Sequence, residues 1–361
     1  MRPITDPLQQ TDRVYVRWRG RKFLFFGGCD YFRISSHPRI LAAMKKAIPR
    51  FGLSVAASRM TTGEHVLYQQ LETQLAEFFD VPTATLFSCG YLANLAVGQA
   101  LSGKHTIALI DERAHMSLWD ASGQLNCAVR RYRHRDMAAL QKLIAVGGKQ
   151  SRPIVFTDGM FAYDGSVAPL KQIMRHLPVG GVLMVDDAHG AGMLGKQGKG
   201  TIELEGISRA RVIQTVTLSK AFGVYGGAVL GSIKLREQIV KHSRIFTGNT
   251  PMPLPLVNAA VESVKILGSD KSMRLRLQLN VARLRDRLAS KSCEVETTPG
   301  PIVRITPKSE NDERRIRSRL INAGIYPSFI RYPGWPGTGC FRFVVSSEHT
   351  QRHLDSLADS L

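Results

Sequence analysis

Short apolar runs rich in β-branched residues alternate with helical patterns from about residue 80 onward, and this alternation constrains the fold most strongly. Six runs predict strands, at residues 85–88, 106–111, 154–158, 182–187, 212–218 and 227–231. Three segments between them predict helices, at residues 91–100, 137–146 and 170–176. Such alternation favours a mostly parallel α/β sheet with helices on both faces. In that architecture, ligands bind beyond the carboxyl ends of the strands.

The chain on either side of this alternating core has a different pattern. Residues 22–26 predict a short strand and residues 37–50 a helix. After the core we expect helices at 255–267 and 275–288, a strand at 302–306, a helix at 312–323, a loop at 332–339, a strand at 340–346 and a terminal helix. A chain of 361 residues has room for two domains. We therefore expect an N-terminal segment over 1–36, a large α/β domain over 37–265 and a small α+β domain over 266–361.

The composition indicates the cellular location of the chain and whether its cysteines form disulfide bonds. No apolar run approaches the roughly 20 residues that span a bilayer, and residues 1–13 are too polar for a secretory signal. We therefore expect a cytoplasmic protein. The five cysteines are Cys29, Cys89, Cys127, Cys293 and Cys340. They are widely scattered and form no CxxC pair or Cys/His cluster, so we expect free thiols and no zinc site.

The segment 217–223 is the sharpest chemical feature of the chain. Its sequence, Thr-Leu-Ser-Lys-Ala-Phe-Gly, places Lys220 at the end of an apolar strand, and two more glycines follow at 226 and 227. A lysine that is partly shielded from water can form an imine with a carbonyl cofactor. The alternative is a surface lysine that merely ends a strand, because most lysines are exposed and have no special role.

The strand pattern at 182–187 ends abruptly in Asp186, Asp187 and, two residues later, His189. Carboxylates at the carboxyl end of a parallel strand point into the ligand crevice. A carboxylate in an apolar setting is costly unless a cation pairs with it, and the protonated pyridine nitrogen of pyridoxal phosphate is such a cation. A metal site is the competing interpretation, but the sequence lacks further clustered ligands. A strand that ends in solvated polar residues is the alternative without function.

Residues 86–94 predict a strand, a turn that contains glycine and the start of a helix, with Cys89, Gly90 and Tyr91 at the junction. Free backbone N–H groups at a helix start bind anions such as a phosphate. Most α/β proteins have such a junction, so this feature alone is weak. His115 follows another predicted strand. It could stack on a planar cofactor or carry a proton, although a lone histidine is more often structural.

Taken together, these segments resemble the α-oxoamine synthases, which are fold-type I pyridoxal-phosphate enzymes. The resemblance runs from about Leu24 to the C-terminus in the family's order. It includes residues 35–38, 87–94, 111–117, 164–170, 186–200, 217–223 and 342–350. The run at 186–200, together with Arg-Tyr-Arg-His at 131–134, favours the branch of the family that serves biotin synthesis.

The resemblance implies roles for the residues around the cofactor ring. Lys220 holds pyridoxal 5'-phosphate as a Schiff base, and Asp186 pairs with the pyridine nitrogen. His189 contacts the ring hydroxyl, and His115 stacks on the ring face. The resemblance also implies that no metal is needed.

The resemblance further implies how the phosphate is held and how the chain assembles. Thr217 and the backbone around Cys89, Gly90 and Tyr91 hold the phosphate, and Thr250 reaches in from a second subunit. The family is homodimeric, with active sites shared across the interface. A homodimer is therefore expected here.

The resemblance implies a transferase that condenses an amino acid with an acyl thioester, releases carbon dioxide and yields an aminoketone. L-alanine is the expected amino acid, and a pimeloyl group on coenzyme A or on an acyl carrier protein is the expected acyl donor. Lys220 is the expected base for the α-proton. Arg342 binds the amino acid's carboxylate, for which a planar guanidinium with two parallel hydrogen bonds is well suited.

Several positions depart from the family pattern on the substrate side. Cys29 stands where an asparagine normally helps to hold the amino-acid carboxylate, and Ala162 where a serine usually lies near the ring hydroxyl. Tyr68 replaces a usual histidine, and two alanines at 56 and 57 replace a Gly-Gly pair. Each lost hydrogen bond alters affinity by about 1 kcal/mol without abolishing the chemistry. Another α-oxoamine synthase that uses glycine or serine, such as a glycine C-acetyltransferase or a serine palmitoyltransferase-like enzyme, is the alternative.

The net charge of +20 is unusual for a metabolic enzyme. Basic residues gather at 13–22, 130–135, 271–291 and 314–319, and the last two clusters lie on helical patterns whose outer faces need charge in any case. A solvated basic surface is one interpretation, and attraction of a phosphorylated or acidic acyl carrier is another. A nucleic-acid-binding protein is the alternative from another class, but no binding motif is present and aromatic residues are sparse at 7%.

Overall fold

The computed structural model describes residues 6–148, 150–291, 293, 295–331 and 339–361. These residues form two compact units. The large unit consists of His37–Phe161 and Val167–Asp270, and the small unit of Met1–Ser36, Ala162–Ser166 and Lys271–Leu361. The loop predicted at 332–339 falls, except for its last residue, outside the described residues. Within the described part of the chain, no helix has the length and apolar character needed to cross a membrane.

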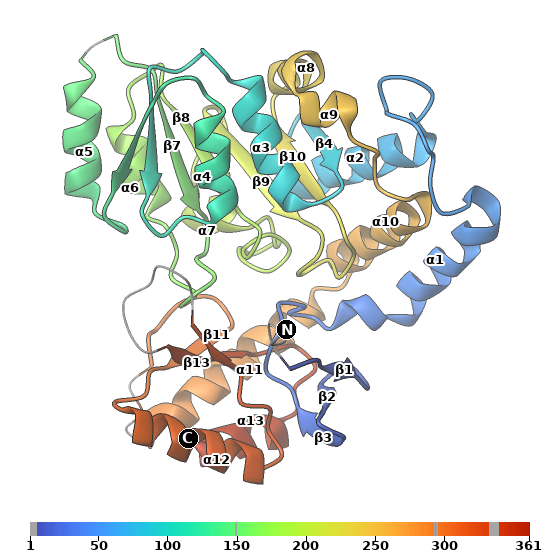
Figure 1. Ribbon diagram of the computed structural model, residues 1–361, viewed down its shortest axis with the longest axis vertical. Coiled ribbons are helices and arrows are strands. Elements are labelled where there is room, and N and C mark those ends of the chain that lie inside the picture. Colours follow the sequence, from blue (N-terminus) through green and yellow to red (C-terminus); the bar gives the residue numbers. More distant parts are fainter. Residues whose placement is uncertain (1–5, 149, 292, 294, 332–338) are drawn as a thin grey trace. The chain divides into compact units, whose positions relative to one another are not determined.

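The large unit is built on a seven-stranded sheet with the order β4-β10-β9-β8-β7-β5-β6 (Figure 1). Its strands are β4 (Thr83–Phe87), β5 (Ile107–Asp111), β6 (Ala128–Tyr132), β7 (Pro153–Asp158), β8 (Val182–Asp186), β9 (Val212–Thr217) and β10 (Gly227–Gly231). β10 is antiparallel to both β4 and β9, and every other pair is parallel. All strands except β10 therefore point the same way, and their carboxyl ends meet at one edge.

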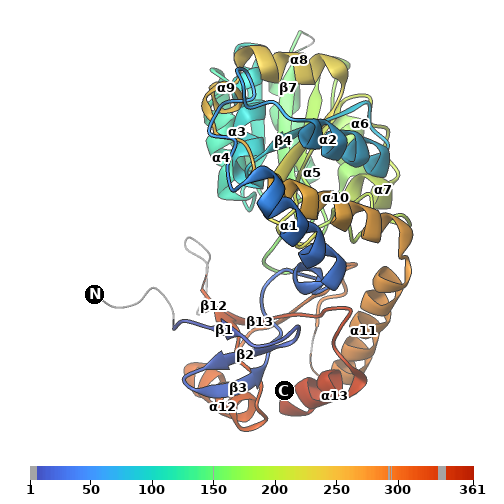
Figure 2. The same ribbon diagram turned by 90° about the vertical axis from the view of Figure 1, so that its right-hand side faces the viewer.

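Helices cover both faces of this sheet because its central strands are apolar on both sides. On β8, Met184 packs with α3 (Gly90–Ala100) and α4 (Met116–Gly123) in one cluster, together with β5 and β7 residues. Leu183 and Val185 pack with α5 (Met137–Val146), α6 (Leu170–His176) and α7 (Thr201–Glu205) in the other. Figure 2 shows α3 and α4 on one side of the sheet and α5 to α7 on the other. The prediction of a mostly parallel sheet with helices on both faces is confirmed.

Five further helices complete the large unit. They are α1 (Pro38–Phe51), α2 (Val66–Phe79), α8 (Ile233–His242), α9 (Arg244–Gly248) and α10 (Leu254–Ser269). Asn258 on α10 donates a hydrogen bond to the carbonyl of Ala43 on α1 (2.8 Å), and Arg39 of α1 pairs with Glu262 of α10 (2.7 Å). Apolar burial and these polar contacts together fix α1 against α10.

In its described residues, the small unit contains two antiparallel sheets and three helices. One sheet has the order β1-β2-β3 and the other β11-β13-β12. The strands are β1 (Gln9–Gln10), β2 (Tyr15–Trp18), β3 (Arg21–Leu24), β11 (Ile302–Ile305), β12 (Phe329–Ile330) and β13 (Cys340–Val344), and the helices are α11 (Ser272–Ala289), α12 (Glu310–Asn322) and α13 (Gln351–Ser360). A 3-10 turn, η1, covers Ile34–Ser36. β13 is central in its sheet and all five of its residues are buried.

Candidate active site

Polar side chains of the large unit end neighbouring strands at the carboxyl edge of its sheet. Asp158 at the end of β7 lies opposite Asp186 at the end of β8, and Asp186 lies opposite Thr215 of β9. Thr217, the last residue of β9, lies opposite Gly227 of β10. Because these strands are buried along their length, the first polar groups that can meet a ligand are those where the strands end.

Lys220 lies in the turn that follows β9, and its side chain contacts a histidine from the neighbouring strand connection. The Nζ atom of Lys220 is 2.8 Å from Nε2 of His189, which follows β8 and is 7% exposed. Hydrogen bonds from Leu218 N to Gly226 O (2.9 Å) and from Gly223 N to Lys220 O (3.0 Å) close the turn. The structure thus brings together the lysine and the histidine that the sequence singled out.

Asp186 is held in one orientation by hydrogen bonds from both sides. Its Oδ2 accepts from Asn94 Nδ2 (2.7 Å), and its Oδ1 accepts from the backbone N–H of Ala188 (3.0 Å). Asn94 in turn accepts from the hydroxyl of Thr215 (2.6 Å) and donates to Ser117 Oγ (2.8 Å). Asn94, Thr215 and Ser117 are each 1% exposed, so this network is fixed in the core and leaves the remaining lone pairs of Asp186 for a cation.

His115 joins the same network from the end of β5. Its backbone N–H donates to Asp158 Oδ2 (2.9 Å), and its ring Nδ1 lies 2.7 Å from Ser117 Oγ. The residue itself is exposed, and its ring packs edge-on against Tyr91 with 6.1 Å between the centroids. Burial, and then the charge of Asp186, raise the pKa of Asp158 well above its usual range. Asp158 therefore holds a proton more tightly than an ordinary aspartic acid does.

The start of α3 forms a cradle for an anion next to Thr217. Cys89, the residue before the helix, has an extended backbone and makes no side-chain hydrogen bond to the first turn. A Cβ added to Gly90 would lie 3.1 Å from the Cβ of Thr217, and one added to Gly227 would lie 2.5 Å from the backbone nitrogen of Gly90. The glycines thus allow a close approach of backbone and side chain here, and the N–H groups of the first turn can bind a phosphate.

Asp187 points into the core instead of the site. It is fully buried and accepts hydrogen bonds from the Thr201 N–H (2.8 Å), the Thr201 hydroxyl (2.9 Å) and Gln214 Nε2 (2.7 Å). Burial raises its pKa to about 6. Among the described residues, no group of three or more His, Cys, Asp or Glu side chains is arranged to hold a metal ion.

Two residues predicted to belong to the site, Thr250 and Arg342, are not part of the group of side chains described above. Thr250 is an exposed residue of the large unit between α9 and α10. Arg342 belongs to β13 of the small unit, where its Nε donates to the carbonyl of Ala162 (2.6 Å) and its guanidinium lies 3.9 Å from Cys29 Sγ. Two of the departures from the family pattern, Cys29 and Ala162, therefore touch the predicted carboxylate-binding arginine directly.

Pyridoxal phosphate has three charged or reactive parts, which are an aldehyde, a ring nitrogen and a phosphate. The Lys220 amine beside His189 suits the aldehyde, the anchored Asp186 suits the ring nitrogen, and the open start of α3 next to Thr217 suits the phosphate. Asn94 and Asp158 complete this site, and sequence reasoning did not assign them a role. The fold and the site together define a fold-type I pyridoxal-phosphate enzyme.

Comparisons with known proteins agree with this class. Residues 29–361 match the family described as aminotransferase class I and II. The 8-amino-7-oxononanoate synthase of Methylococcus capsulatus is 36% identical over 363 residues, which cover 100% of this chain and 93% of the relative. The synthase of the same name from Thioalkalivibrio sulfidiphilus is 34% identical over 345 residues, which cover 95% and 88% of the two chains.

Solved structures give the same result. A serine palmitoyltransferase from S. paucimobilis with bound PLP and myriocin has a TM-score of 0.90 and 26% identity, with 98% of this chain and 91% of that chain covered. An 8-amino-7-oxononanoate synthase from Francisella tularensis has a TM-score of 0.79 and 28% identity, with 93% and 97% covered. The chain belongs to the aminotransferase class I and II family and, within it, to the α-oxoamine synthases. It is an enzyme whose cofactor is pyridoxal phosphate.

Proposed function

We propose that this enzyme condenses L-alanine with a pimeloyl thioester, releases carbon dioxide and forms 8-amino-7-oxononanoate. The observation that carries the proposal is the Lys220–His189 contact beside an anchored Asp186, in a chain that is 36% identical along its whole length to a synthase of that name. Relatives named for serine palmitoyl transfer share the fold at 26% identity, so the sequence supports alanine over serine.

The chain's own residues supply binding, orientation and proton transfer. Bound pyridoxal phosphate supplies an aldehyde that takes up an amine and a protonated ring that accepts electrons. Lys220 would hold the cofactor through its Nζ atom, and the same Nζ would take the α-proton of the amino acid. His189 holds that nitrogen in place at 2.8 Å. Asp186 keeps the ring nitrogen protonated, and Asn94 prevents the carboxylate from turning away.

We assign the phosphate to the first turn of α3 and to Thr217, with Thr250 contributed by the second subunit of a homodimer. Thr250 is exposed on its own chain, which leaves it able to serve a neighbour. His115 presents an exposed ring that can cover one face of the cofactor. The cytoplasmic location and the choice between coenzyme A and an acyl carrier protein belong to the same proposal.

Arg342 is assigned to the carboxylate of the amino acid. Cys29 replaces the usual asparagine beside it, and its Sγ lies 3.9 Å from the guanidinium. A thiol is a much weaker hydrogen-bond donor than an amide, so we expect weaker binding of the amino acid while the reaction itself is retained.

A labelling experiment tests the proposal. Borohydride reduction of the yellow enzyme should fix the cofactor on the peptide that contains Lys220, and L-alanine with a pimeloyl thioester should release carbon dioxide faster than glycine or serine does. K220M should lose both the label and turnover. K199M is the matched control, because Lys199 is a half-buried lysine of the same unit that pairs with Asp80. Turnover that survives K220M, or a label on another lysine, contradicts the proposal.

A further inference from the structure

Residues 247–252, here called the Thr250 segment, comprise the end of α9 and most of the connection to α10, and they are tied to three other parts of the large unit. Each tie is a hydrogen bond between a side chain and a distant residue. The bonds run from Ser58 Oγ to Thr247 O (2.6 Å), from Asn249 Nδ2 to Ser88 Oγ (2.7 Å) and from the Tyr68 hydroxyl to Met252 O (2.6 Å). Thr250 itself is exposed between these anchors. The backbone on both sides of Thr250 is therefore fixed while its side chain is free to meet a ligand.

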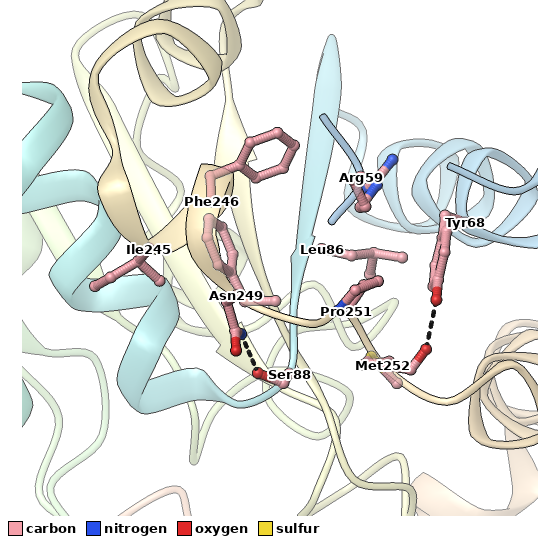
Figure 3. A pocket seen from close by; sticks show the side chains of 10 residues that line it. Arg59, Tyr68, Leu86, Ser88, Ile245, Phe246, Asn249, Pro251 and Met252 are labelled. Carbon is pink, nitrogen blue, oxygen red and sulfur yellow. Dashed lines mark hydrogen bonds between the residues drawn. The ribbon is translucent and has the colours of Figure 1, made fainter. Parts of the chain in front are cut away.

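Tyr68 is the most deeply buried of these anchors. It lies on α2, is 0% exposed, and its ring is 5.0 Å from the guanidinium carbon of Arg59. Arg59 is itself clamped by Glu64 and Glu72, with nitrogen–oxygen distances of 2.6 Å to each. Figure 3 shows the Tyr68 hydroxyl aimed at Met252 and the Asn249 amide aimed at Ser88. Arg59, which is paired with two glutamates, thus fixes the Tyr68 ring by packing against it. The Tyr68 hydroxyl in turn fixes the Thr250 segment through its hydrogen bond to Met252 O.

The space between these side chains is too small to be a substrate site. The cavity that Figure 3 shows has a volume of about 20 Å³ and is lined by Arg59, Tyr68, Met252 and their neighbours. Such a volume holds about one water molecule. Burial raises the pKa of Tyr68 to about 12, so its hydroxyl keeps its proton and remains a donor at neutral pH. The cluster therefore positions backbone and does not bind substrate.

The Asn249 anchor connects the Thr250 segment to the anion cradle. Ser88 accepts the Asn249 bond and directly precedes Cys89, the residue before α3. We propose that Tyr68 is a positioning residue for cofactor binding: its bond to Met252 O fixes the Thr250 segment so that the Thr250 hydroxyl is presented to the cofactor phosphate of the second subunit in the proposed homodimer. This inference rests on the proposed role of Thr250. Ordering the segment before the ligand arrives removes an entropic cost from binding.

The effect of Tyr68 should depend on the phosphate of the ligand. Y68F, in the full-length chain stripped of cofactor, should bind pyridoxal phosphate about fivefold more weakly than the parent chain, the effect of one lost hydrogen bond. Its affinity for pyridoxal, which lacks the phosphate, should be unchanged. Absorbance titrations measure both affinities. An equal loss for the two ligands would mean that Tyr68 only stabilises the fold, and this outcome overturns the proposal.

Matched variants separate positioning from stability. Y15F removes a tyrosine hydroxyl that lies 3.1 Å from His353 in the small unit, and it should leave both affinities unchanged. S58A removes the first anchor of the Thr250 segment and should reproduce the phosphate-selective loss, even where Y68F folds poorly. A normal affinity of both Y68F and S58A for pyridoxal phosphate overturns the proposal.

A double-mutant cycle tests whether Tyr68 acts through Thr250. T250V should itself weaken pyridoxal phosphate binding, and adding Y68F to T250V should cause no further loss, because residues that act as one unit are not additive. Fully additive losses, or a T250V chain that binds normally, contradict the inference. Failure of the proposed function is visible separately, since the parent chain would then release no carbon dioxide from L-alanine and a pimeloyl thioester.

Discussion

A single buried residue, Asp187, should make the free energy of unfolding of the enzyme depend on pH. Burial raises its pKa to about 6 from an ordinary value of 3.8, so the folded chain holds this proton more tightly than the unfolded chain does. Stability falls with rising pH wherever the folded state binds more protons. A pKa difference of about 2 corresponds to about 3 kcal/mol, which is the upper limit of the loss from Asp187 between pH 4 and pH 6.

D187N cannot titrate and should lack this loss. Its amide can still accept from the Thr201 N–H and donate to the Thr201 hydroxyl, so the variant should fold. We expect the free energy of unfolding of the parent chain, minus that of D187N, to fall between pH 4 and pH 6.5. Urea unfolding of both cofactor-free chains at four pH values measures this difference. Parallel pH profiles would show that Asp187 does not titrate in this range.

Some residues near the candidate site could be singled out from the sequence, and others could not. Lys220, Asp186 and His189 could be singled out from the sequence as candidates because each lies at or just after the end of an apolar strand in a distinctive local setting. Asn94 and Asp158 were missed as site residues, since their roles depend on partners far along the chain. Asn94 bonds to Asp186, which is 92 positions away, and such a contact has no local signature. A polar residue on the buried face of a helix is the one feature that could have indicated Asn94.

At the scale of secondary-structure elements, β10 packs so closely against the start of α3 that there is no room for a side chain on Gly227. A Cβ on Gly227 would lie 2.5 Å from backbone atoms of Cys89 and Gly90. G227A should therefore lower the free energy of unfolding by about 1–3 kcal/mol through overpacking, and it should weaken pyridoxal phosphate binding because the cradle is distorted. Thermal unfolding and cofactor titration of the variant measure the two effects.

Gly123 provides the matched control for this substitution. It ends α4, and a Cβ added there meets no other heavy atom within 4 Å. G123A should keep cofactor affinity unchanged and should stabilise the chain by up to about 1 kcal/mol, since alanine loses less entropy in a helix. If G227A and G123A behave alike, the close approach at Gly227 has no role in holding the cradle.

The elements that were predicted correctly are those with apolar residues on both faces or a clear helical period. The strand at Gly227–Gly231 was predicted with its observed bounds, and the helices at Met137–Val146 and Leu170–His176 were as well. β6 was missed because it is an edge strand in which Arg130 and Arg131 are exposed. Such a strand carries charge that discourages pairing with another chain, and this charge masks the apolar pattern. The antiparallel direction of β10 also has no sequence signature.

At the scale of the whole molecule, the net charge of +20 raises the question of nucleic-acid binding. Many cations of the two basic helices are paired within the chain. On α11 and just after it, Arg276, Arg283, Arg287 and Lys291 pair with Glu348, Asp355 and Asp359, and on α12, Arg314, Arg315 and Arg317 pair with Glu310, Asp312 and Glu313. Paired cations release fewer counterions from a phosphate backbone than solvated cations do.

We therefore expect only weak, non-specific binding to duplex DNA, with a dissociation constant on the order of 10⁻⁴ to 10⁻⁶ M at physiological salt. Binding should fall steeply between 50 and 200 mM salt, because it depends on phosphate contacts alone. Fluorescence anisotropy with two unrelated duplexes measures both the affinity and its salt dependence, and turnover with L-alanine measured in parallel should be unaffected by the DNA. Tight binding to one duplex but not to the other at 200 mM salt would contradict this expectation. It would mean that the basic surface recognises a DNA sequence.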